Sequence, residues 1–116
     1  MERDPRVYLW DIREAAAEIA AFIAGLDRAG YDASALVRAA VERKFEIIGE
    51  AMAQLARLNP ALAAGIPDFR KVIAFRNMLI HGYRRIDHDE VWRAATISLP
   101  PLHAAVAALL DTLGPP

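Results

Sequence analysis

The 116-residue sequence has no cysteine, which excludes disulfide cross-links and thiolate metal sites. Its formal net charge is only −1, so nucleic acid can bind only at a local basic patch and not through the charge of the whole molecule. No apolar run reaches the roughly 18 residues that span a bilayer, and the charged residues near the N-terminus are unlike a signal peptide. We therefore expect a cytoplasmic protein that does not enter a membrane.

Segments that would form strands are also lacking. No stretch alternates β-branched with polar residues, and Thr and Asn occur only twice each, whereas Ala, Leu, Arg and Glu are frequent. Alanine and unbranched side chains lose little entropy in a helix, so the composition favours helices. A chain of this length has room for one domain. We expect residues 1–116 to form a single all-α domain.

Apolar residues recur at helical spacing, which predicts an antiparallel bundle of four to five helices. The first helix is expected to begin at Asp4 and Pro5 and to close at Gly30. The second begins at Asp32 or Ser34, which can both cap it. It runs to about residue 58, where the following proline stops it.

The second half of the chain is expected to contain the remaining helices. Residues 59–67 are interpreted as a loop, and Asp68 as the cap of a third helix that Gly82 ends in the left-handed conformation. Asp87, with a glutamate three residues later, predicts the capped start of a fourth helix. Two prolines at 100 and 101 are expected to break or kink it before a fifth piece, residues 102–113.

The predicted third helix ends with four polar side chains, Arg76, Asn77, His81 and Tyr83. Arg76 and His81 are roughly 140° apart around an ideal helix, but the long arginine side chain and the glycine after His81 allow both to reach one phosphate beyond the helix end. Histidine transfers protons near neutral pH, and arginine binds two phosphate oxygens at once. Such a pair suits RNA cleavage by the 2′-hydroxyl, which needs no metal ion and no cofactor.

Simpler interpretations remain open at this point. A histidine that ends a helix often only contacts the last carbonyl groups, and an arginine one turn earlier is often solvated. Arg84 and Arg85 are the expected phosphate contacts, although a pair of arginines in a loop is often merely solvated. The three histidines do not pair with carboxylates in a recognised zinc pattern, so no metal site is predicted.

These residues resemble the motif of HEPN domains, in which an arginine with a polar neighbour is followed by a histidine near the end of a bundle helix. The order of motifs is similar to that of one branch, the HepT-like toxins, and the resemblance extends from about residue 36 to residue 102. It rests on residues 46–51 (EIIGEA), Arg76-Asn77 with His81-Gly82-Tyr83, and residues 91–92 (VW) with 99–102 (LPPL).

The resemblance implies a homodimeric ribonuclease toxin of a type II or type VII-like toxin–antitoxin pair. Its two Arg76–His81 pairs would face each other across a cleft at the dimer interface, where RNA is cleaved. The resemblance also implies a nucleotidyltransferase antitoxin of the MntA type, which adds AMP to the tyrosine at the position of Tyr83. The alternative for Tyr83 is an aromatic residue at the surface with a solvated hydroxyl.

Two further expectations concern the neighbours of this site. Glu42, Glu46 and Glu50 recur every fourth residue on one face of the second helix, and one of them is a candidate to orient Arg76. Otherwise they form a solvated face. The alternative to an enzyme is a non-catalytic helical module that binds a nucleotidyltransferase partner and assists its substrate binding.

Overall fold

The computed structural model describes residues 4–82, 85–114 and 116, and these residues form helices and no strand. The predicted all-α class is therefore confirmed. Tyr83 and Arg84 lie outside the described residues. In chain order the elements are α1 (Pro5–Ile23), α2 (Arg28–Ala33), α3 (Ala35–Leu58), α4 (Pro60–Ala64), α5 (Phe69–His81), α6 (His88–Arg93), the π-helical turn η2 (Ala94–Ser98) and α7 (Leu99–Leu113).

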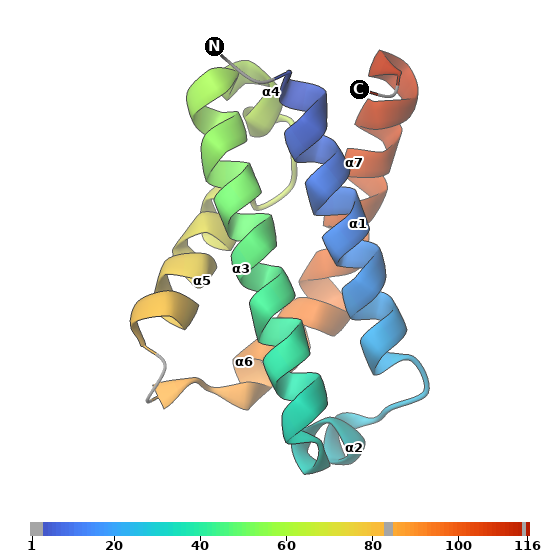
Figure 1. Cartoon of the computed structure of the whole chain (residues 1–116), viewed down its shortest axis with the longest axis vertical. Coiled ribbons are helices and arrows are strands. Elements are labelled where there is room, and N and C mark those ends of the chain that lie inside the picture. Colours follow the sequence, from blue (N-terminus) through green and yellow to red (C-terminus); the bar gives the residue numbers. More distant parts are fainter. Residues whose placement is uncertain (1–3, 83–84, 115) are drawn as a thin grey trace.

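The long helices alternate in direction, as in an up-down bundle (Figure 1). Helix α3 lies in the middle, with α1 packed along one side of it and α5 along the other. The continuous segment of α6, η2 and α7 returns along α1. Helix α5, which carries the candidate site, is therefore held mainly by α3.

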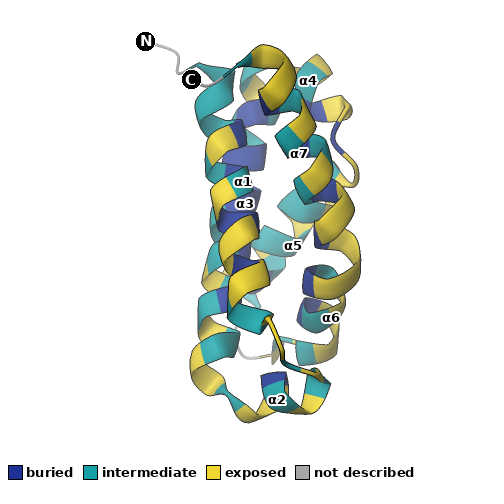
Figure 2. Cartoon of the chain, turned by 90° about the vertical axis from the view of Figure 1, so that its right-hand side faces the viewer, coloured by how far each residue is buried: buried dark blue, intermediate teal, exposed yellow. Residues whose placement is uncertain are grey.

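The core is formed by apolar residues on the inner faces of α1, α3 and α7 (Figure 2). No polar or charged residue other than tyrosine is fully buried among the described residues. Helical spacing of the apolar residues on each helix produces this continuous seam. Its largest fully buried side chains include Leu9, Ile12, Ile19, Tyr31, Ile48, Met52, Leu55 and Leu102.

Three of the predicted helix starts are confirmed by side-chain caps. Asp4 accepts a hydrogen bond from the Arg6 N–H at 2.9 Å, and Ser34 accepts one from the Val37 N–H at 3.2 Å. Asp87 accepts from the backbone N–H groups of residues 89 and 90. These bonds satisfy N–H groups that have no partner within the helix.

Two boundaries in the first half of the chain differ from the prediction. Helix α1 ends at Ile23, and Gly30 lies inside the short helix α2 because the side chain of Asp27 caps a new helix there. Residues 59–67 are not a plain loop. Asn59 accepts a hydrogen bond from the Leu62 N–H at 3.1 Å and starts α4, in which Pro60 takes the first helical position.

Helix α5 has the predicted bounds, but both of its ends differ in detail. Asp68 has φ 59° and makes no capping hydrogen bond; its carboxylate lies 3.9 Å from Lys71 Nζ instead. Gly82 follows the helix with φ −105°, so it does not adopt the left-handed conformation. A different constraint favours glycine, because a Cβ at this position would lie 2.8 Å from the carbonyl oxygen of Met78.

The two prolines at 100 and 101 do not break the last helix. The π-helical turn η2 precedes them, and Leu99 N–H bonds to the carbonyl of Ala94, five residues earlier. This wider turn lets the chain enter α7 with prolines at its first positions, where their missing N–H groups are tolerated.

The segment His88–Leu113 is long and apolar enough to cross a membrane by length and composition, and 28% of its most apolar window is buried. From the sequence alone, no such segment was expected. Length and composition alone do not distinguish a membrane span from a bundle helix, and α7 packs along α1 in this fold.

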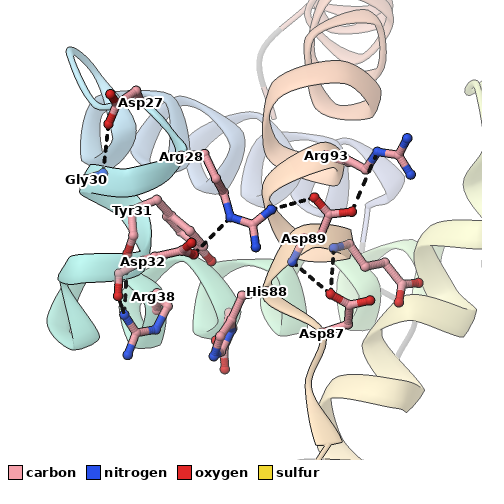
Figure 3. A network of polar contacts seen from close by, with 12 residues as sticks. Asp27, Arg28, Gly30, Tyr31, Asp32, Arg38, Asp87, His88, Asp89 and Arg93 are labelled. Atoms are coloured by element: carbon pink, nitrogen blue, oxygen red, sulfur yellow. Dashed lines mark hydrogen bonds and ion pairs between the residues drawn. The ribbon is translucent and has the colours of Figure 1, made fainter.

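A network of polar contacts joins α2 to the start of α6 (Figure 3). Arg28 bonds to Asp32 at 2.9 Å and to Asp89 at 2.5 Å. Tyr31 packs against Trp92 with ring centroids 5.2 Å apart. These contacts fix the position of the start of α6. The segment that connects α5 to α6 is therefore anchored at its α6 end.

Candidate functional site

Arg76 lies on the face of α5 that packs against α3, and its side chain is 27% exposed. Its Nη2 group donates to Glu50 Oε2 at 2.5 Å, and its Nη1 group donates to Asn77 Oδ1 at 2.7 Å. The Nε atom is buried and has no hydrogen-bond partner among the described residues. The guanidinium group is therefore held between two helices rather than free in solvent.

Glycine at position 49 makes this arrangement possible. A Cβ at Gly49 would lie 2.1 Å from Arg76 Cβ, 2.7 Å from its Cγ and 3.2 Å from the carbonyl oxygen of Val72. No side chain larger than a hydrogen atom fits there without moving α5. The glycine thus brings the backbone of α3 directly against Cβ and Cγ of Arg76. The next residue, Glu50, contacts the guanidinium group.

Arg76 and Glu50 line a groove of about 520 Å³ between α1, α3 and α5. Tyr8 and Asp11 of α1 lie on one side of it, and Ile80 of α5 on the other. With its carboxylates and arginines the groove has a mixed charge. Its volume is large enough for part of a nucleotide.

His81 is the last residue of α5 and is exposed. Within the described part of the chain, no hydrogen bond or ion pair joins His81 to Arg76, and His81 does not line the groove. Arg85 is also exposed, and its backbone N–H donates to the Gly82 carbonyl at 2.8 Å. A single copy of the chain therefore places Arg76, Asn77 and His81 on the last turns of α5, without a hydrogen bond or ion pair between Arg76 and His81 among the described residues.

A second groove, of about 690 Å³, lies on the other side of α5, between α5 and the α6–α7 segment. Its apolar residues include Phe45, Val72, Phe75, Met78 and Leu102, and it contains neither Arg76 nor His81. Among residues 4–82 and 85–114, no group of three or more histidine and carboxylate side chains is arranged to hold a metal ion.

Comparison with known proteins identifies the family. The model of the family described as HepT-like, Ribonuclease HepT-like, matches residues 12–109. The chain belongs to the HepT-like ribonuclease family. The range that this HEPN family matches contains Glu50, Arg76 and His81, and also residues 83–84, which the structure does not describe.

Three proteins of Methanocaldococcus jannaschii are similar to this HepT-like chain. "Putative RNase MJ1380" is 30% identical over 105 residues, which cover 90% of this chain and 95% of that protein. "Putative RNase MJ1216" is 29% identical over 101 residues, 87% of this chain and 83% of that protein. "Putative RNase MJ0125" is 29% identical over 112 residues, 97% and 96% of the two chains. No solved structure matches the chain significantly.

Three glutamates of this HepT-like protein were candidates to orient Arg76, and the structure distinguishes between them. Glu42 lies 3.9 Å from His88 Nδ1, and Glu46 lies 3.3 Å from Arg43 Nη1. Only Glu50 contacts Arg76. The spacing of four residues shows that the three glutamates share one face of α3. It does not show how α3 is rotated against α5, and this rotation decides which glutamate contacts Arg76.

Proposed function

We propose that this chain is a metal-independent endoribonuclease in which His81 transfers protons and Arg76 stabilises the phosphate. The observation that carries the proposal is the restraint of Arg76 by Glu50 and Asn77, five residues before an exposed histidine at the end of the same helix. Family membership and the RNase names of the relatives support RNA as the substrate.

In the proposed reaction the 2′-oxygen of the RNA attacks the adjacent phosphorus, and the bond from phosphorus to the 5′-oxygen breaks. A neutral His81 accepts the proton of the 2′-hydroxyl, and a protonated His81 donates one to the departing 5′-oxygen. Arg76 contacts the phosphoryl oxygens, whose negative charge increases in the transition state. The products are an RNA with a 2′,3′-cyclic phosphate and an RNA with a free 5′-hydroxyl.

We propose that the active form is a homodimer. This reaction needs a proton acceptor and a proton donor, and one copy supplies one histidine at the end of α5. An exposed Ile80, with 39% of its surface accessible, lies directly before His81 and offers apolar area for a second copy. A cleft between two copies would also unite Arg76 with His81 and double the basic residues of the site.

We further propose that the enzyme is the toxin of a toxin–antitoxin pair of type II or type VII character. Its partner would be a nucleotidyltransferase of the MntA type that silences it by adding AMP to Tyr83. Tyr83 lies outside the described residues, so the support for its role is its position two residues after His81 and the resemblance to HepT-like toxins. Arg84 and Arg85 are proposed to contact RNA phosphates.

The decisive experiment is an RNase assay with the purified protein and matched variants, with and without a chelator. We expect cleavage that is unaffected by the chelator and yields cyclic phosphate ends. His81→Ala and Arg76→Ala should each lower the rate by about 100-fold or more. His103→Ala, a histidine on α7 outside both grooves, is the control and should cleave normally.

The alternative is a non-catalytic module that docks onto a nucleotidyltransferase. The apolar groove between α5 and α6–α7 favours this alternative, because it offers a binding surface that contains neither Arg76 nor His81. Activity that does not depend on His81, or no activity at all, would overturn the proposed enzyme and favour the docking module.

A further inference from the structure

Glu50 occupies a special position among the acidic residues of α3. It is the residue whose carboxylate contacts Arg76 across the α3–α5 interface, with Oε2 and Nη2 2.5 Å apart. Its side chain is 48% exposed, so the ion pair lies at the edge of the groove and not in the core. Exposed ion pairs contribute little to folding stability. Stability alone therefore does not account for the close approach of these two residues.

The hydrogen bonds of Arg76 determine which of its donors are available to a substrate. A guanidinium group has five N–H donors: one on Nε and two on each Nη atom. Nε is buried, one Nη2 donor is bound by Glu50, and one Nη1 donor is bound by Asn77. One donor remains on each Nη atom. Two donors are the number that a phosphate bound through two of its oxygens requires.

We propose that Glu50 is a positioning residue that holds Arg76 in the orientation required for phosphate stabilisation. This inference rests on the proposed ribonuclease function. A free arginine side chain has high rotamer entropy, which it must lose to bind a phosphate in one geometry. Glu50 and Asn77 restrain the guanidinium before RNA arrives, and Gly49 holds its root against α3.

The charge of Glu50 predicts different effects of its replacement on KM and on kcat. A carboxylate beside Arg76 weakens the attraction of the site for phosphate in the ground state. Replacing it with a neutral amide of the same shape therefore leaves KM unchanged or lower. The amide oxygen still accepts a hydrogen bond but holds the guanidinium less strongly than the carboxylate does, so Arg76 is less firmly oriented and kcat falls by on the order of 10-fold to 100-fold. A general loss of folding would not produce this division.

The test is a comparison of kcat and KM for the full chain, Glu50→Gln, Glu50→Asp and a matched control. The control is Glu18→Gln, because Glu18 pairs with Lys44 across α1 and α3 at 3.0 Å with similar exposure, 48% and 25%, and lies outside the groove. We expect Glu50→Gln to lose kcat without a rise in KM and Glu50→Asp to retain part of it. Glu18→Gln should match the wild type.

A second measurement is independent of activity. The side-chain nitrogen signals of Arg76 in NMR spectra report restricted rotation of the guanidinium, and Glu50→Gln should release it while Glu18→Gln does not. Unchanged Arg76 signals in Glu50→Gln, or an unchanged kcat, would overturn the positioning role. If cleavage depends on His81 and Arg76 but not on Glu50, this inference alone fails. If the wild type shows no cleavage that depends on His81, the proposed function fails and the inference with it.

Discussion

The Cα of Gly49 lies so close to Arg76 that a methyl group on it would be 2.1 Å from the arginine's Cβ. Real non-bonded carbon atoms do not approach to this distance, since attraction between them is greatest near about 3.5–4.0 Å. The backbone of α3 is therefore in close contact with the residue proposed to bind the phosphate. The tight helix contact and the candidate catalytic arginine therefore involve the same residue, Arg76.

Gly49→Ala is expected to destabilise the protein by about 1–3 kcal/mol, because α5 must move away from α3 to accept the new methyl group. The same shift should lower the rate of RNA cleavage by displacing Arg76. Urea unfolding and the RNase assay measure the two effects. Gly65→Ala is the control, since its Cβ would meet only the Leu62 carbonyl oxygen at 3.5 Å. Equal stability of the two variants would contradict the tight contact.

A homodimer is expected in solution, and light scattering should give twice the chain mass of 12.8 kDa at micromolar concentration. Ile80→Glu places a charge on the exposed apolar surface beside His81 and should shift the dimer towards the monomer. Leu36→Glu changes a side chain that is 81% exposed at the start of α3, and it should leave the mass unchanged. A monomer for the wild type would rule out the composite site.

Tyr83→Phe is expected to cleave RNA like the wild type but to resist silencing by the partner nucleotidyltransferase. No proton transfer is assigned to the phenol, whereas AMP on its oxygen would place an anion where it competes with RNA phosphate for Arg76 and Arg85. Incubation with the partner, ATP and Mg²⁺ followed by mass mapping locates the label. A label on another residue, or silencing of Tyr83→Phe by AMP transfer, would show that the mechanism is wrong.

Tyr31 is expected to make the stability of the fold fall at high pH. Burial, with a smaller contribution from the Glu42 carboxylate, raises the pKa of Tyr31 from 10.0 to about 12. Between these values the unfolded phenol has lost its proton while the folded one keeps it. Stability is therefore complete below pH 10 and decreases as the pH rises towards 12.

Tyr31→Phe should remove this part of the pH dependence, and urea unfolding below and above pH 10 compares the two slopes. The hydroxyl is buried without a hydrogen-bond partner among the described residues, so the variant should be as stable as the wild type or more stable at neutral pH. A loss of stability of about 1 kcal/mol or more at neutral pH would mean that the hydroxyl is hydrogen-bonded in solution.

The features that local sequence could predict are the helix class, the capped starts and the motif. Asp4, Ser34 and Asp87 cap helices through bonds to residues two or three positions away, so neighbours in sequence suffice to identify them. The bounds of α5 were also predicted correctly from Asp68 and Gly82, although Asp68 makes no capping hydrogen bond and Gly82 is not left-handed.

The features that could not be predicted depend on how helices meet. The selection of Glu50 over its two neighbours follows from the rotation of α3 against α5. The helical spacing of the three glutamates does not contain this rotation. No hydrogen bond or ion pair joins Arg76 to His81 among the described residues, so the convergence expected from their reach stays a prediction, which the proposed dimer would fulfil.

The π-helical turn Ala94–Ser98 determines how α7 is rotated about its own axis. Each residue of a helix turns the following part by about 100°, and this turn inserts one residue between α6 and α7. If the same residues formed a regular α-helix, the buried stripe of α7, which contains Leu102 and Val106, would be rotated by about 100° around the helix axis and away from α1. The wider turn takes up the extra residue and so keeps these apolar side chains facing the core.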